Sequence, residues 1–444
     1  MNNNYKLIFS IFLVIAIICI SLLIIKGDSV PVMGLLFGMP LALLIIFEPI
    51  YGLYLLPIVS NLLPRGINLT GFSFLSPGLI VSIITFFSMV INTISKKRKL
   101  KWTQLYLVMI SVISIITIRF IASGHSAYFQ DLFNYLQSCI VFILFFSIIR
   151  NQEQAHRVLT VWTIVYSIFC ASYLMLGIKS GVGDDIITNI SGLRNQDVGD
   201  YNVNTITWLV VLYIPIIIGL ISYNKLFIKY FMIFLLFIMM LTILLTSSRA
   251  AFFGLIMTLV LFIFFKQNKV GFSLKYYIGI IFLIFLSFYT WSFIISVNYS
   301  DGSRALDGDH LNNQFALRTG WIIVSIIDGF EKPIFGHGIA DRPFHSVLAK
   351  SFFRYGIVYT ILIYSSLIIG LKNSYYCFKN SINDKTSLFM KMVFISLIVA
   401  VPESIYGATL YSAAYHQVIW LITAYTIFAK NEVRNETSIK NISI

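Results

Sequence analysis

The sequence predicts an all-α, polytopic integral membrane protein with about 14 transmembrane helices (12–14) and a large extracytoplasmic loop. Two observations lead to this prediction. The chain of 444 residues is 58% hydrophobic and only 11% charged, which leaves too little polar surface for a soluble globule of that length. It also contains apolar runs of about 20 residues, the length that a helix needs to cross a bilayer. Strands of a membrane barrel would alternate apolar and polar residues, and these runs do not.

The apolar runs between polar connectors define the expected spans. The first run resembles a signal peptide, but it is long, lacks a small-residue cleavage site and turns at Lys26-Gly27-Asp28 into a second run, so we treat it as a span. The third is bounded by Pro49 and Pro64 and interrupted by Pro57. The expected spans cover residues 7–25, 30–47, 50–63, 75–94, 105–122, 132–149, 158–176, 204–222, 231–246, 250–265, 276–295, 351–370, 388–402 and 412–428.

The basic residues indicate the orientation, because cytoplasmic connectors retain lysine and arginine. With a cytoplasmic N-terminus, the cytoplasmic segments hold 20 of the 32 basic residues and five of the 18 acids. The basic excess is therefore a topology signal and does not indicate a nucleic-acid partner. We expect a multi-pass protein of the bacterial inner membrane with both termini in the cytoplasm.

The outer connectors carry eight arginines but only four lysines. The planar guanidinium group suits bidentate binding of phosphate or carboxylate, so the outer face is expected to bind an oxyanion. Alternatively, single arginines pair with outer acids or extend to lipid headgroups, which is our interpretation of Arg119 and Arg354 near span ends. The eight are Arg65, Arg119, Arg194, Arg249, Arg304, Arg318, Arg342 and Arg354.

Two outer connectors, 177–203 and 296–350, are long enough to be functional. The chain thus divides into membrane helices 1–11 (1–295), a large extracytoplasmic loop (296–350), and helices 12–14 with a cytoplasmic tail (351–444). Apolar residues at helical spacing predict an interfacial helix near 313–330, ended by Gly329 and Pro333. The stretch before it, around His310, is expected to be a mobile loop.

Several polar residues stand out in the outer connectors. Thr246-Ser247-Ser248-Arg249 separates two spans, and it is either a phosphate clamp assisted by the serine hydroxyls or a tight turn with an arginine that extends to the headgroups. His345 and His337 precede a span, where a histidine could accept the proton of a sugar hydroxyl. Glu403 and His416 are weaker candidates.

The sequence offers no metal or cofactor chemistry. Asp184-Asp185 is an isolated pair, Asp307-Gly308-Asp309 lacks the spacing of a calcium loop, and a Walker loop is missing. Three of the four cysteines lie in apolar runs and Cys377 in a polar connector, so neither a disulfide framework nor a zinc site is expected. The substrate itself must supply the energy of any reaction.

Three segments resemble the superfamily of O-antigen and capsular polysaccharide polymerases and O-antigen ligases. The superfamily has a span that ends in a Thr/Ser-Arg turn, which resembles LLTSSRAAFFGLIM in this chain. It also has an earlier Arg…Asn segment, which resembles SGLRNQDVGDYNVNTITWLVVLYIPIII. A later succession of motifs in the superfamily resembles four groups of residues in this chain, in the same order: Arg318 with Trp321, Pro333-x-x-Gly336-x-Gly338, His345-Ser346 and Tyr355-Gly356-Ile357. The resemblance covers roughly residues 191–361, while the N-terminal half matches only in hydropathy.

The resemblance implies a fold of the GT-C type and metal-independent glycosyl transfer from undecaprenyl-pyrophosphate-linked oligosaccharide. It implies that Arg249 and Arg318 hold the pyrophosphate and that His345 lies near the acceptor hydroxyl. We expect further substrate contacts from Arg194, Ser248, His337 and Arg342. Membrane lipid, a flippase and a chain-length regulator are the expected partners, and no cofactor is expected.

Polymerase, ligase and flippase functions compete. A polymerase moves a growing glycan onto a lipid-linked repeat unit, whereas a ligase moves the finished chain to lipid A core. His345-Ser346 stands where ligases usually have His-Asn, which favours the polymerase. A lipid flippase would show paired repeats of interrupted helices, which we do not find in the sequence.

Overall fold

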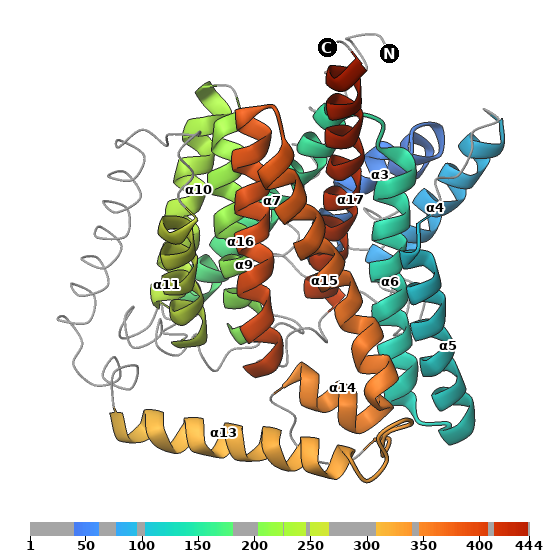
Figure 1. Cartoon of the computed structure of the whole chain (residues 1–444), viewed down its shortest axis with the longest axis vertical. Coiled ribbons are helices and arrows are strands. Elements are labelled where there is room, and N and C mark those ends of the chain that lie inside the picture. Colours follow the sequence, from blue (N-terminus) through green and yellow to red (C-terminus); the bar gives the residue numbers. More distant parts are fainter. Residues whose placement is uncertain are drawn as a thin grey trace. The chain divides into compact units, whose positions relative to one another are not determined.

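The computed structural model describes residues 40–61, 77–95, 103–180, 203–224, 226–245, 249–265, 308–339, 346–406 and 413–442 (Figure 1). Every regular element in these ranges is a helix, which confirms the all-α prediction for them. Five helices are long and apolar enough to cross a membrane, so the chain is a polytopic membrane protein. They cover Gly78–Ser95, Leu105–Ser123, Ser126–Ile148, Ile357–Asn380 and Asp384–Pro402.

The chain forms two compact units. The first comprises residues 1–101 and 147–149, and the second residues 102–146 and 150–444. In the first unit, α3 (Ile50–Asn61) packs antiparallel on α4 (Pro77–Ser95). A Cβ atom at Gly52 would lie 2.0 Å from the Thr85 hydroxyl, so the glycine permits the close approach. The third expected span, 50–63, thus corresponds to α3, a helix of 12 residues.

The second unit is organised around α9 (Val203–Tyr223), whose side chains from Trp208 to Ile218 are almost all buried. Its helix partners are α7 (Gln152–Ser180), α10 (Leu226–Leu245), α11 (Arg249–Phe264) and α16 (Asp384–Tyr406). Small residues bring the helices close: a Cβ atom at Gly219 would lie 2.7 Å from the Phe389 ring and one at Gly254 2.6 Å from Val211. Such contacts are typical of helix packing in membranes.

A second group of helices carries the residues discussed below. It comprises α5 (Leu105–Ser123), α6 (Ser126–Ile148), α15 (Ile357–Asn380) and α17 (Ala413–Ile442), and α15 packs on α5, α16 and α17. Ile110, Ile118 and Ile121 of α5, and Ile361 and Ile368 of α15, are large apolar side chains that stay exposed. Exposed apolar stripes of this kind suit contact with lipid.

The expected span 351–370 was predicted to begin too early in the sequence. Residues 351–355 belong to a separate short helix, α14 (Val347–Tyr355), and the long helix α15 begins only at Ile357. Gly356 separates the two with a φ of 88°, a conformation that favours glycine. Cys377, expected in a polar connector, lies instead inside α15 and is buried.

A helix is present where one was expected near 313–330: α13 (Gly308–Gly329), which runs crosswise to α15 and α16 (Figure 1). Its expected position at the membrane interface remains a prediction. Ile322 and Ser325 are buried, whereas Trp321, Ile323 and Ile327 are exposed. The helix includes His310, so the expectation of a mobile loop there is wrong at residues 308–314. Expected spans 7–25 and 276–295, and most of 30–47, lie outside the described residues.

Three expected cytoplasmic connectors meet at one end of the second unit. The Thr386 hydroxyl accepts a hydrogen bond from Gln152 Nε2 at 3.1 Å and one from the Tyr223 hydroxyl at 2.5 Å. These residues stand next to the connectors α6–α7, α9–α10 and α15–α16. The alternation of spans expected from the sequence places these three connectors on the same side of the membrane.

Candidate functional site

Only part of the predicted site falls in the described residues. His337 is described with its side chain, whereas the structure gives only the backbone of Arg249, the first residue of α11, and of Arg318 within α13. Those three roles remain predictions. The other predicted site residues lie outside the described residues: Arg194, Ser248, Arg342 and His345.

His337 makes several contacts within the protein. Its ring stacks on that of Phe353, with centroids 4.9 Å apart and planes 12° apart. Its Nε2 lies 2.6 Å from the Asp328 carbonyl oxygen, and therefore donates to it, and 3.8 Å from a Glu331 carboxylate oxygen. About a fifth of the side chain remains exposed.

The segment from Phe330 to His337, here called the 330–337 turn, is attached to the end of α14 through main-chain hydrogen bonds. His337 N donates to Phe353 O at 2.6 Å, and Ile357 N donates to Pro333 O at 2.8 Å. Gly336 has a φ of 68°, and a Cβ atom there would lie 2.7 Å from the Arg354 carbonyl carbon. A Cβ atom at Gly356 would lie 2.1 Å from the Ile334 carbonyl oxygen. Both glycines are thus required by backbone packing.

Helices α5 and α6 hold the other side of the 330–337 turn. Arg119 of α5 donates from Nη2 to the Gly336 carbonyl oxygen at 3.0 Å. Tyr128 of α6 is 2% exposed, and its hydroxyl lies 3.1 Å from where a Cβ atom of Gly338 would stand. The α5–α6 connector is tight because Gly124 ends α5 in the left-handed region and His125 Nδ1 accepts from the Ala127 amide at 3.2 Å.

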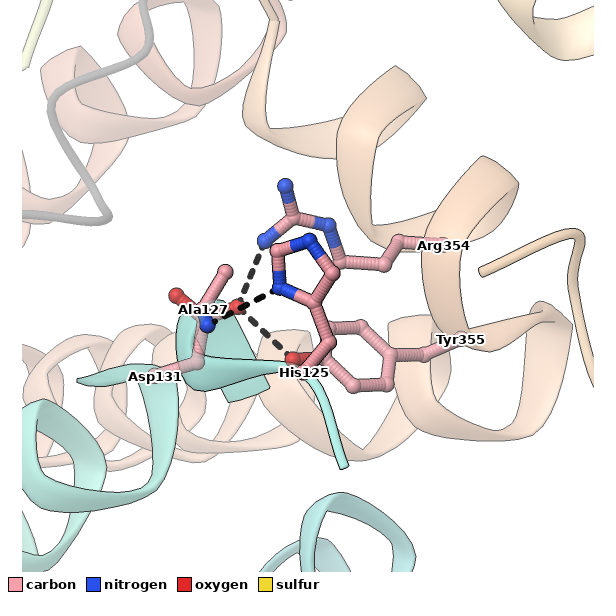
Figure 2. Close-up of polar contacts among 5 residues, drawn as sticks. All are labelled: His125, Ala127, Asp131, Arg354 and Tyr355. Atoms are coloured by element: carbon pink, nitrogen blue, oxygen red, sulfur yellow. Dashed lines mark hydrogen bonds and ion pairs between the residues drawn. The ribbon is translucent and has the colours of Figure 1, made fainter. Parts of the chain in front are cut away.

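Next to the 330–337 turn lies a largely buried charged group of four residues, which we call the Asp131 cluster: Asp131, Lys350, Arg354 and Tyr355. Figure 2 shows Arg354 and Tyr355 of α14 converging on Asp131 of α6. Arg354 Nη1 and the Tyr355 hydroxyl each donate to the same carboxylate oxygen, Oδ2, at 2.7 Å. The side chains of Asp131 and Arg354 are only 11% and 9% exposed.

Lys350 adds a second cation, one helical turn before Arg354 on the same face of α14. Burial lowers the pKa of the Lys350 amine to about 8; the Asp131 carboxylate acts to raise this pKa and the Arg354 guanidinium to lower it. The cluster therefore holds two basic side chains and one carboxylate. Both basic side chains lie within electrostatic range of the Asp131 carboxylate.

His416 of α17 extends the cluster towards the bundle interior. It is 7% exposed, lies in electrostatic range of Asp131, and its ring is 6.1 Å from that of Tyr135. It also lines a cavity of about 20 Å³ together with Val347, the first residue of α14. That volume suits a single water molecule, not a sugar.

Sequence reasoning found the region but missed the arrangement. Arg354 was expected to pair with an acid or to extend to headgroups, and the structure pairs it with Asp131. Lys350 and Asp131 were not singled out, since a lysine and an aspartate next to spans are ordinary topology signals. Within the described residues no group of three or more His, Cys, Asp or Glu side chains is arranged to hold a metal ion.

No protein-family model matches the chain, and no curated protein matches its sequence.

Proposed function

We propose that the protein is a polysaccharide polymerase, a metal-independent glycosyltransferase that moves a growing glycan from undecaprenyl pyrophosphate onto a lipid-linked repeat unit at the outer face of the inner membrane. One observation carries the proposal. Two segments of the family resemblance, Pro333–Gly338 and Tyr355–Ile357, are in direct backbone contact beside the cations Lys350 and Arg354. Segments that resemble a transferase thus meet beside two basic side chains.

In the proposed reaction, a sugar hydroxyl of the repeat unit attacks the anomeric carbon of the growing glycan. The bond from that carbon to the pyrophosphate oxygen breaks, and undecaprenyl pyrophosphate leaves with the electron pair. His345 accepts the hydroxyl proton. Arg249 and Arg318 stabilise the negative charge that develops on the leaving group, which is most effective where water is scarce.

The described residues support His345 through its neighbours in the chain. Ser346 follows His345, is fully buried and caps α14, since its hydroxyl accepts from the Ala349 amide at 3.2 Å. The Asp131 cluster then fixes α14 against α6. The chain directly after the proposed base is therefore held rigidly, as general-base catalysis requires.

The surface glycan of a deletion strain tests the proposal against its competitors. Loss of a polymerase leaves single repeat units on the surface, loss of a ligase leaves no glycan on lipid A core, and loss of a flippase leaves none outside the membrane. We expect single repeats, restored to long chains by the wild-type gene. Arg249→Lys and Arg318→Lys should each fail to restore them at normal protein level, because a lysine cannot make the bidentate contact.

Thiol labelling tests the orientation on which the proposal depends. Cysteines introduced as Asp184→Cys and Ser303→Cys should react with an impermeant reagent in intact spheroplasts, and Asn383→Cys should not. The protein without added cysteines is the control, since Cys139, Cys170 and Cys377 are buried. The reverse labelling pattern would rule out an outer-face reaction.

A further inference from the structure

A second cationic site lies at the other end of the bundle, where α15 ends beside α17. It consists of Lys372, Lys430 and Arg434, here called the α15–α17 cation cluster. Lys430 Nζ donates to Asn373 Oδ1 at 2.8 Å and lies 5.6 Å from the centre of the Tyr376 ring. The Arg434 guanidinium lies 5.8 Å from the same ring centre. Two cations therefore share one aromatic ring.

These positive charges repel one another. Burial, and after it the charges of Arg434 and Lys372, lower the pKa of the Lys430 amine. Two acids on this part of α17, Glu432 and Glu436, follow Lys430 and Arg434 by two residues, which is about half a helical turn. Glu436 acts electrostatically on Tyr223 of α9. The cation cluster thus brings three basic side chains into electrostatic range of one another.

The position of Lys372 indicates what kind of anion reaches the cation cluster. Ile361, Ile368, Lys372, Tyr375 and Lys379 follow one another at helical spacing along α15, and all five side chains are exposed. The apolar part of this stripe faces lipid, because α15 is one of the membrane-crossing helices. It ends in Lys372 and in Tyr375, over whose ring Lys379 Nζ lies at 4.8 Å. Aromatic and basic residues in this order mark the headgroup level of a span.

We propose that the α15–α17 cation cluster binds the phosphate of an anionic phospholipid headgroup, with the acyl chains lying along the exposed stripe of α15. A soluble phosphate would share the charge contacts but not the apolar stripe. This inference concerns the end of the bundle opposite the Asp131 cluster, and it does not depend on the proposed transferase function.

The test uses the full-length protein purified in detergent. Bound lipids are counted by native mass spectrometry during titration with phosphatidylglycerol or phosphatidylcholine. Lys372→Gln/Arg434→Gln changes two exposed side chains and keeps the contact of Lys430 with buried Asn373. Arg150→Gln/Lys385→Gln is the matched control, because it removes one arginine and one lysine exposed at the same end.

We expect the wild type and the control to bind phosphatidylglycerol equally and the Lys372→Gln/Arg434→Gln variant about 30-fold more weakly, since each basic residue at an anionic surface contributes a factor of about five. Phosphatidylcholine should bind weakly to all three. An equal loss in both variants would show unspecific surface charge and overturn the proposal. Displacement of the lipid by millimolar inorganic phosphate would overturn it too, in favour of a soluble anion.

Discussion

Breaking the contact between Asp131 and Arg354 should destabilise the protein strongly. Both side chains are about nine-tenths buried. Removal of one partner from such a pair costs about 3–5 kcal/mol, because the other charge stays buried. Asp131→Ala also removes the acceptor of the Tyr355 hydroxyl, worth about 1 kcal/mol. We therefore expect a loss of about 4–6 kcal/mol for Asp131→Ala, and less for Arg354→Met, which leaves Asp131 beside Tyr355 and Lys350.

The double variant Asp131→Ala/Arg354→Met isolates the interaction. Because neither charge of the pair remains, its loss should be smaller than the sum of the single losses by about 2 kcal/mol or more. Thermal unfolding in detergent can be followed with a thiol-reactive dye, since Cys139, Cys170 and Cys377 are buried and free. Single variants that unfold at the wild-type temperature, or losses that simply add, would refute the reasoning.

Three further predictions address neighbouring residues. The pKa of Lys350 is about 8 in the folded protein, below the value of about 10.4 for an unfolded lysine. Between these two pH values the unfolded chain binds more protons than the folded one, so the free energy of unfolding should rise with pH across that window. Lys350→Met should flatten this rise in thermal unfolding series, and an unchanged slope would contradict the burial of the amine. Gly336→Ala should destabilise the protein by more than Gly124→Ala, because both have a positive φ but only Gly336 lacks room for a Cβ atom; equal unfolding temperatures would disprove this. His345→Ala should slow polymerisation of purified lipid-linked repeats by about 10²–10⁴-fold, and a wild-type rate would remove His345 from the mechanism. In contrast, His337→Ala should mainly lower the unfolding temperature, because the stacking on Phe353 is lost.

Hydropathy predicted the membrane class and most described spans, because a helix of about 20 apolar residues has no other stable environment. It failed at α14, whose apolar residues merge in the sequence with those of α15. The break at Gly356 follows from the approach of the Ile334 carbonyl, a tertiary contact that no local pattern reveals. Likewise, the turns of α13 around His310 are polar, so composition alone suggested a loop.

The candidate site was predictable only in part. Pro333, Gly336 and Gly356 were singled out by the resemblance, and the structure explains the glycines by backbone packing. The pairing of Asp131 with Arg354 joins residues on α6 and α14 that are 223 positions apart in the sequence. Charge counting placed both on the outer side, but it could not select one acid among thirteen. The structure identifies Asp131 as the acid that pairs with Arg354.

The attachment of the 330–337 turn has a consequence for how related sequences should vary. His337–Phe353 and Ile357–Pro333 are joined through main-chain atoms on both sides, and Arg119 reaches a main-chain carbonyl. Substitutions at 357 therefore leave these bonds intact, whereas positions 337 and 353 also share a ring contact. Gly336 and Gly356 are fixed by steric limits. In homologous chains this junction should show two invariant glycines, and covariation should report mainly the ring contact between positions 337 and 353.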